Sequence, residues 1–174
     1  HCIKNPRSLL LSPTSSGKSL MIYYIVRWYQ EQTEGKILIV VPTVNLTTQL
    51  YSDFEEYSLK DSWSTEKNTH KISAGIDKET KKKIVISTWQ SIFNQPQSYF
   101  NQFEMLIVDE VHLATAKGLT GIAEKTINCH IKIGCTGTLK EAKCNKAVLE
   151  GLFGPVFVSS TTKELMDANF VSNL

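Results

Sequence analysis

The sequence predicts an α/β domain of three layers, in which a mostly parallel β-sheet lies between two layers of helices. Short, continuously apolar runs alternate along the chain with segments of helical periodicity, a pattern typical of repeated strand–helix–strand units. In a sheet with one solvent-exposed face, apolar and polar residues alternate along each strand. Most of the runs here lack that alternation, so we expect strands covered on both faces. Right-handed crossovers between parallel strands then place helices on both faces of the sheet.

The strands are predicted, in chain order, at residues 8–11, 36–41, 83–87, 105–108, 131–135 and 156–158. Between them, apolar residues at three- and four-residue steps predict helices at 18–32, 44–57, 89–93, 119–127 and 141–152. The polar stretch 58–79 gives no clear secondary-structure pattern, and residues 71–74 within it are either a short strand or part of a loop. The positive run 78–83 that follows is either a solvated turn or a phosphate-binding patch.

Size and composition narrow the class of protein. The 174 residues suit one compact domain with its own core. Nineteen Lys and Arg against 17 Asp and Glu give a net charge of +2, which excludes a polybasic arm and an acidic tail. We expect no membrane-spanning segment, because the longest uncharged apolar stretch, 20–26, is far below the roughly 20 residues needed.

Two further expectations concern the cysteines and the start of the chain. The four cysteines form no Cys-x-x-Cys pair and have no His at a ligand-like spacing, so we expect reduced, mostly buried thiols of an intracellular protein rather than a zinc site. The chain begins at His1 rather than Met and shows no signal peptide, so we expect an excised or processed piece of a longer polypeptide.

A phosphate-binding loop is predicted at residues 12–19, Ser-Pro-Thr-Ser-Ser-Gly-Lys-Ser, between a predicted strand and a predicted helix. Backbone N–H groups of such a loop and the positive helix end make a concave anion site. We expect Lys18 to reach the β- and γ-phosphates of a nucleotide and the Ser19 hydroxyl to ligate Mg²⁺. The other candidates for phosphate contact are Thr14, Ser15, Ser16 and Gly17. Because Ser12 stands where the general pattern has Gly, a helix start that merely spells Gly-Lys-Ser is an alternative for this segment taken alone.

The second half of the site follows the predicted strand 105–108, where the chain continues Asp109-Glu110-Val111-His112. Two adjacent carboxylates at the end of a buried strand are costly unless a cation or hydrogen bonds meet them, and ligands bind at this end of parallel strands. We expect Asp109 to hold Mg²⁺ and Glu110 to polarise the attacking water as general base. His112 either couples the γ-phosphate site to a neighbouring domain or simply begins a polar loop.

In order along the chain, these motifs resemble those of the superfamily 2 helicases, and most closely the phage recombination and repair members of that family. Asp109 to His112 matches their DExH box, and residues 12–19 resemble motif I, with serine departing from the usual residue at 12, 15 and 19. Residues 41–49 resemble motif Ia, 87–91 resemble motif Ib, and 136–138 (Thr-Gly-Thr) resemble motif III. The resemblance implies a RecA-like ATP-binding domain that uses ATP and Mg²⁺.

The resemblance also implies roles for individual residues. Lys18, Asp109, Glu110 and His112 would be the catalytic set, and Thr136 and Thr138 would couple hydrolysis to movement. The resemblance assigns contacts with the DNA backbone, without recognition of base sequence, to Thr43, Thr47, Gln49 and Thr88. Trp89 either stacks on a base or begins a helix as a buried aromatic residue, and Arg7 is either a nucleotide contact or a surface charge.

For the whole protein, the resemblance implies an ATP-dependent DNA helicase or translocase that acts on branched DNA in recombination, repair or fork processing. Residues 1–160 would form the ATP-binding domain, and 161–174 would start the connection to a second RecA-like domain that carries the arginine finger. The chain alone should then bind ATP–Mg²⁺ weakly, hydrolyse it poorly and not unwind DNA. The expected location is the cytoplasm, that of the host if a phage encodes the protein.

The sequence is also compatible with three other functions. The first is a translocase with the same core that does not separate strands, as in restriction or remodelling enzymes. The second is a regulatory module that binds nucleotide without turnover, although the intact Lys18, Ser19, Asp109 and Glu110 speak against it. The third is a small-molecule P-loop kinase, which the paired Asp-Glu and the motif Ia resemblance disfavour.

Overall fold

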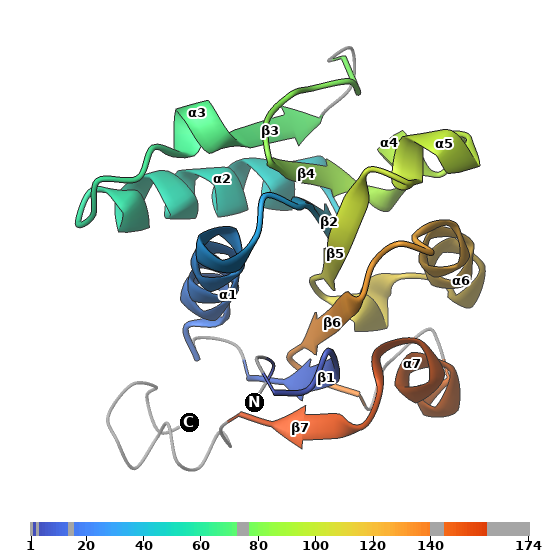
Figure 1. Ribbon diagram of the computed structural model, residues 1–174. Helices are drawn as coiled ribbons and strands as arrows, with labels where there is room; N and C mark the ends of the chain where they lie inside the picture. The colour runs from blue at the N-terminus through green and yellow to red at the C-terminus, as the bar shows by residue number, and fades with distance from the viewer. Residues whose placement is uncertain (1, 3, 14–15, 73–76, 140–144, 160–174) are drawn as a thin grey trace, which may run out of the picture.

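Seven parallel strands form one sheet in the order β3-β4-β2-β5-β6-β1-β7 (Figure 1). The computed structural model describes residues 2, 4–13, 16–72, 77–139 and 145–159. In chain order the strands are β1 (Arg7–Leu11), β2 (Lys36–Val41), β3 (Thr69–Ile72), β4 (Ile84–Thr88), β5 (Phe103–Val108), β6 (Ile131–Thr136) and β7 (Val156–Val158). Because every pairing is parallel, the carboxyl ends of all the strands lie along one edge of the sheet.

Helices cover both faces of this sheet, with α1 and α2 on one side and α6 and α7 on the other (Figure 1). The helices are α1 (Lys18–Gln32), α2 (Val44–Ser58), α3 (Thr65–Asn68), α4 (Trp89–Ile92), α5 (Gln97–Phe100), α6 (Ala116–Lys125) and α7 (Lys146–Phe153), with a 3₁₀ turn η1 (Val111–Leu113). Several begin at a side chain that accepts a backbone N–H of the first turn, a common way to satisfy free helix donors. These caps are Thr43, Ser64, Thr88, Thr115 and Asn145.

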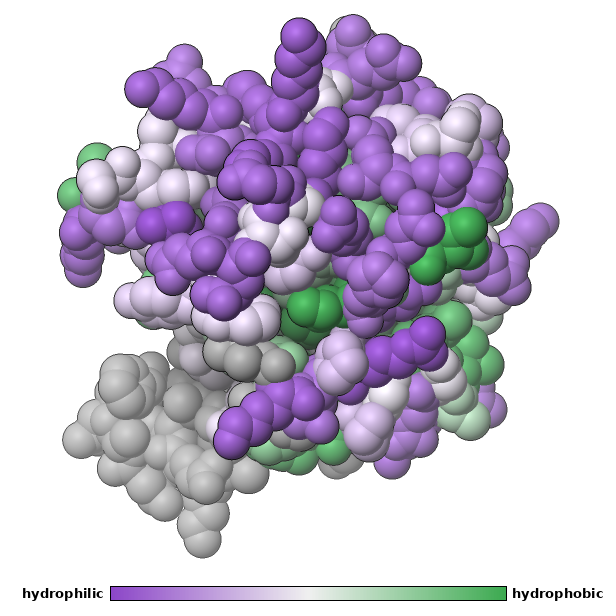
Figure 2. All heavy atoms as spheres, viewed as in Figure 1, coloured by the Kyte–Doolittle hydropathy of each residue, from purple (hydrophilic) through white to green (hydrophobic). Residues whose placement is uncertain are grey.

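The core is divided between the two faces of the sheet by the alternation of strand side chains. On β2, Ile37, Ile39 and Val41 pack in the cluster that includes α1 and α2, whereas Leu38 and Val40 pack in the cluster on the opposite face. The central strand β5 divides its residues in the same way. Figure 2 shows hydrophilic side chains over most of one outer face, with small apolar patches between them.

The predicted three-layer α/β architecture is confirmed, as are all the predicted strands to within two residues at each end. The helix predicted at 119–127 lies instead at Ala116–Lys125, because Thr115 caps it by accepting the Gly118 N–H. The open stretch 71–74 contains the end of β3, while residues 73 and 74 lie outside the described part of the chain. The short helices α3 and α5 and the turn η1 were not predicted, since three or four residues show no periodicity.

Two other predictions cannot be compared with the structure in full. The helix predicted at 141–152 is found at Lys146–Phe153, and residues 141–144 lie outside the described ranges. The predicted domain boundary at 160 and the connection 161–174 lie outside them as well. No helix in the described part of the chain is both long enough and apolar enough to cross a bilayer.

Candidate nucleotide site

The phosphate loop joins β1 to α1 at the carboxyl edge of the sheet, as predicted. Gly17 adopts φ +75°, a left-handed conformation that suits glycine, and its carbonyl accepts the Met21 N–H at 3.0 Å as α1 begins. The departure at Ser12 has a structural explanation. Its buried hydroxyl lies 2.5 Å from the Ser16 hydroxyl and so bridges the loop, while its N–H donates to the Thr136 carbonyl at 2.9 Å. Thr14 and Ser15, also predicted to contact phosphate, lie outside the described residues.

Lys18 meets both carboxylates of the acidic motif. Its ammonium donates to Oε1 of Glu110 and lies 3.4 Å from Oδ1 of Asp109. Burial opposes protonation of Lys18, but the two carboxylates outweigh that cost and raise its pKa above the ordinary 10.5. The two carboxylates, expected to need a cation or hydrogen bonds at the end of a buried strand, therefore meet the ammonium of Lys18.

Asp109 and Glu110 share this single cation. Burial raises the pKa of Asp109 above its ordinary 3.8, and the neighbouring Glu110 raises it further, although Lys18 acts in the opposite direction. Oδ1 of Asp109 accepts the Glu110 N–H at 2.9 Å. Glu110 has φ +49°, the only non-glycine residue with positive φ in the described part of the chain. Backbone strain of this kind tends to be kept at functional sites.

His112 and the motif III threonines continue the site behind Glu110. Nδ1 of His112 lies 3.2 Å from Oε2 of Glu110 and 2.8 Å from Oγ1 of Thr136. Oγ1 of Thr136 in turn donates to the Thr138 carbonyl at 2.7 Å. The structure thus brings the predicted catalytic and coupling residues together, and His112 does more than begin a loop.

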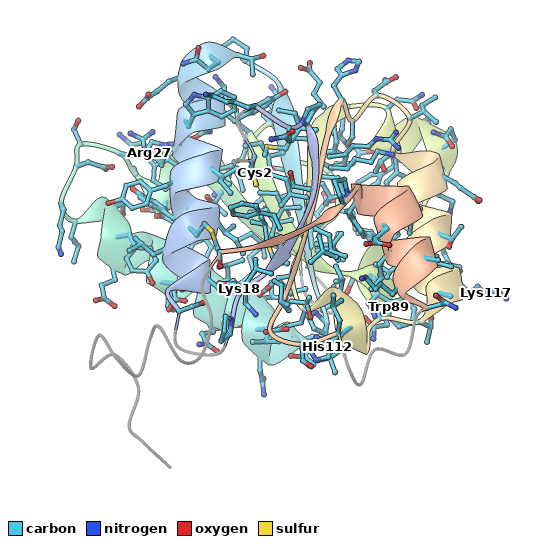
Figure 3. The ribbon with its side chains drawn as sticks, turned by 90° about the horizontal axis from the view of Figure 1, so that it is seen from below. Cys2, Lys18, Arg27, Trp89, His112 and Lys117 are labelled. Carbon is cyan, nitrogen blue, oxygen red and sulfur yellow. The ribbon has the colours of Figure 1, made fainter. Side chains whose placement is uncertain are left out.

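Lys18 and the two carboxylates open into one cavity of about 490 Å³, lined by Pro13, Gly17, Lys18, Ser19, Leu46, Gln49, Leu50, Asp53, Asp109 and Glu110. Figure 3 shows that Lys18 and His112 lie at the same end of the sheet, with Lys117 further out on α6. The Ser19 hydroxyl lies 2.9 Å from the Tyr57 hydroxyl of α2. A cavity that holds an ammonium, a hydroxyl and two carboxylates beside a glycine turn is suited to a phosphate chain and its cation.

The residues predicted to contact DNA differ in their exposure to solvent. Thr43 is exposed and follows β2, and Thr88 ends β4 in register with Val41, so the two motifs are neighbours at one edge. The Thr88 side chain, however, is only 3% exposed and accepts the Ser91 N–H at 3.3 Å, so it caps α4 and does not face solvent. Gln49 lines the nucleotide cavity instead. Thr47 is fully buried and its hydroxyl donates to the Thr43 carbonyl at 3.1 Å, which gives it a structural role in α2. The Thr47 side chain therefore cannot contact DNA in this structure, which corrects that assignment.

Trp89 is half-buried at the start of α4 and packs against the core beside α6, in agreement with the buried alternative (Figure 3). Sequence reasoning missed the contributions of α2 to the cavity, namely those of Leu46, Leu50, Asp53 and the neighbouring Tyr57. Their three- and four-residue spacing follows one side of a helix, so a signal was present in the sequence. What the spacing could not show was that this side of α2 faces the phosphate loop.

Comparison with known proteins agrees with this geometry. The model of the ResIII family, described as type III restriction enzyme, res subunit, matches residues 3–141. The ATP-dependent DNA helicase uvsW of Enterobacteria phage T4 is 41% identical over an alignment of 174 positions, which covers 98% of this chain and 34% of that protein. The DNA 3'-5' translocase XPB2 of Sulfurisphaera tokodaii is 28% identical over 163 residues, 94% of this chain and 34% of that protein. The chain thus spans about a third of the length of these relatives.

Solved structures lead to the same family. The crystal structure of T4 UvsW matches with a TM-score of 0.82 and 41% identity, over 92% of this chain and 32% of that one. The helicase domain of Pyrococcus furiosus Hef shares the fold, with a TM-score of 0.73 and 21% identity over 92% of this chain and 36% of that one. Together with the Lys18–Asp109–Glu110–His112 constellation, these matches show that the chain belongs to the ResIII family, as a RecA-like ATP-binding domain of the superfamily 2 DExH-box helicases.

Proposed function

We propose that this chain is the ATP-binding part of an ATP-dependent DNA helicase or translocase that acts on branched DNA. The observation that carries the proposal is the contact of Lys18 with both Asp109 and Glu110 in a cavity at the carboxyl edge of a parallel sheet. A phosphate-binding lysine, a metal-binding aspartate and a general base are the parts that phosphoryl transfer to water requires. The relative named as an ATP-dependent DNA helicase supports the same function.

The order of events follows from the contacts of Lys18. The Lys18 ammonium donates a hydrogen bond to Oε1 of Glu110, so this oxygen cannot at the same time accept a proton from water. Arriving β- and γ-phosphates would draw Lys18 away, because they offer a stronger concentration of negative charge. Glu110 would then be free to act as base, with His112 beside its second oxygen. In this scheme phosphate binding itself activates the base.

The residues also fit a magnesium ion. Ser19 offers a hydroxyl and Asp109 a carboxylate on the walls of the same cavity. Among the described residues, no three His, Cys, Asp or Glu side chains cluster as a metal site, so the other ligands would be phosphate oxygens and water, as Mg²⁺ often uses with nucleotides. When bound, the ion would neutralise charge that develops on the phosphates.

For DNA, we propose that the exposed Thr43 lies on the track of the sugar-phosphate backbone. Thr43 stands where α2 begins, next to the end of β4, whereas the buried Thr88 accepts the Ser91 N–H as the cap of α4. The short span of the chain relative to uvsW supports a second RecA-like domain in the complete protein. Such a motor would work in the cytoplasm, where DNA and ATP meet.

Calorimetric titration of ATP–Mg²⁺ tests the nucleotide site directly. The wild-type chain should bind weakly, Lys18→Ala should bind at least tenfold less tightly if the ammonium contacts phosphate, and the distant Lys117→Ala should behave as wild type. Equal binding of ATP–Mg²⁺ by wild type and Lys18→Ala would contradict the assignment of the phosphate-binding loop. Efficient ATP-dependent unwinding of a forked duplex by this chain alone would instead remove the need for a second domain.

A second candidate is a translocase that moves on duplex DNA without separating its strands. It is favoured by the relative named as a DNA 3'-5' translocase and by the restriction-enzyme description of the family. The full-length protein can be tested in parallel for strand displacement and for triplex displacement. Triplex displacement without strand displacement would favour this candidate over the helicase.

A further inference from the structure

An apolar depression on α1 adjoins the phosphate loop. It has a volume of about 370 Å³ and is lined by Ser16, Gly17, Leu20, Met21, Tyr24 and Ile25. Gly17 also lines the cavity that holds Lys18 and the two carboxylates, so the two spaces adjoin each other at the start of α1. A molecule whose phosphates bind at Lys18 can therefore extend along α1 into the depression.

Tyr24 supplies an open aromatic ring in this depression. Its side chain is 64% exposed, an unusual state for a large aromatic residue next to a binding loop. It packs edge-on against Tyr23, with ring centroids 5.9 Å apart. Tyr23 is itself buried and donates its hydroxyl to Asp61 at 2.9 Å, so the support behind the Tyr24 ring is fixed.

The distance along the helix suits a nucleotide. Tyr24 lies six residues beyond Lys18 on α1, a separation of roughly 9 Å along the helix axis. Leu20 lies one turn before Tyr24, on the same side of the helix. A ribose can therefore lie over the first turn of α1 while the attached base reaches the tyrosine.

We propose that this depression holds the base of the bound nucleotide, stacked on Tyr24 and packed against Met21. The inference rests on the proposed function, because it requires the phosphates at Lys18. Leu20, Met21 and Ile25 offer no hydrogen-bonding group to a base edge, and stacking on an aromatic ring tolerates any base. The site therefore selects nucleotides by their phosphates and discriminates weakly between bases.

A base bound on the other side of Tyr24 would have different surroundings. There a second depression is lined by Leu20, Tyr23, Tyr24 and Tyr57 together with the charged side chains of Glu56, Lys60 and Asp61. A base on that flank would meet hydrogen-bonding groups and would be selected strongly. Met21 lines only the apolar flank and Lys60 only the polar one, so these two residues separate the two positions.

The test measures binding by calorimetry in the presence of Mg²⁺ for ADP, GDP, CDP and tripolyphosphate, which has no base. In wild type the three nucleotides should bind within about threefold of one another. Tyr24→Ala should weaken ADP about tenfold and leave tripolyphosphate unchanged, while Tyr24→Phe should keep wild-type affinity. Met21→Ala should also weaken ADP, whereas Lys60→Ala and the exposed control Leu59→Ala should not.

Two results overturn the base site while leaving the proposed function intact. One is ADP binding that Tyr24→Ala does not change, with tripolyphosphate binding that still depends on Lys18. The other is strong preference for one base, lost in Lys60→Ala. Failure of the proposed function has a different signature, namely tripolyphosphate binding that is the same in wild type and Lys18→Ala.

Discussion

Nδ1 of His112 lies 2.8 Å from Oγ1 of Thr136, which joins the turn after β5 to the end of β6. Thr136 has a second connection, because its carbonyl accepts the Ser12 N–H at 2.9 Å where the phosphate loop begins. The same residue thus touches the DExH box through its side chain and the phosphate loop through its backbone. A shift of His112 on nucleotide binding would therefore move Thr136 and, through its carbonyl, the start of the phosphate loop at Ser12.

This contact predicts the tautomer of His112. Thr136 has one hydroxyl hydrogen and donates it to the Thr138 carbonyl, so its oxygen must accept from His112. Neutral His112 should therefore carry its proton on Nδ1, where it also faces Oε2 of Glu110. Nitrogen NMR of the imidazole ring should show the Nδ1–H tautomer in wild type and a mixture in Thr136→Val. An Nε2–H tautomer in wild type would mean that Thr136 donates to the ring.

Lys18 should contribute to stability as well as to binding. Lys18→Ala leaves Asp109 and Glu110 adjacent without their cation, and we expect a loss of about 1–3 kcal/mol in the free energy of unfolding. Adding Glu110→Gln should recover part of this loss, since one of the two carboxylates is then neutral. Urea denaturation followed by circular dichroism measures both effects.

A matched control for Lys18 is the exposed ion pair of Lys146 and Glu150, 3.7 Å apart on α7. Lys146→Ala should cost at most about 0.5 kcal/mol, because exposed pairs contribute little. If Lys18→Ala is as mild as this control, the carboxylates are solvated well enough to need no cation. Strict additivity of Lys18→Ala and Glu110→Gln would argue against their coupling.

Asp109→Asn should stabilise the nucleotide-free chain while it abolishes Mg²⁺-dependent tightening of ATP binding. The raised pKa of Asp109 means that its surroundings disfavour the ionised form, and asparagine removes that charge. A gain of about 0.5–2 kcal/mol is expected, as for other residues strained for function.

The sign of the pH dependence follows from the same shift. Because the folded-state pKa lies above 3.8, the folded chain binds more protons than the unfolded one between the two values, and wild type loses stability as the pH rises through that window. The advantage of Asp109→Asn should be largest at neutral pH and disappear as the pH falls below 3.8. A variant less stable than wild type at pH 7 would show that Lys18 needs the Asp109 charge.

The sequence was sufficient to predict where the catalytic groups meet. Continuous apolar runs indicate parallel strands, and parallel strands place Lys18 and Asp109 at one edge whatever the length of chain between them. The DNA contact carried to Thr47 from the motif Ia resemblance was wrong, because a motif match does not show which side of a helix is buried. Its spacing with Leu50, Phe54 and Ser58, the buried residues of α2, would have indicated the core.

Contacts between separate elements could not be predicted in this way. The Ser19–Tyr57 hydrogen bond depends on how α1 and α2 pack, and the Ser12–Ser16 bridge depends on the path of the loop. Neither leaves a trace in local periodicity. The sequence singled out Ser12, Ser16 and Ser19 as residues of the phosphate loop, but it gave no reason to pair any of them with these hydroxyl partners.

Helix α7 packs closely on the sheet at Gly134. Gly134 on β6 is buried, and a Cβ added there would lie 3.0 Å from Leu9 of β1 and from the Phe153 ring of α7. Gly134→Ala should therefore push these fully buried side chains apart and cost about 1–3 kcal/mol, as overpacked cores do. Gly151→Ala on α7 is the matched control, because a Cβ there meets nothing within 4 Å. It should raise stability by roughly 0.5–1 kcal/mol through helix propensity. Thermal unfolding of the two variants should give shifts of opposite sign, and a shift of the same sign for both would mean that α7 does not press on β6.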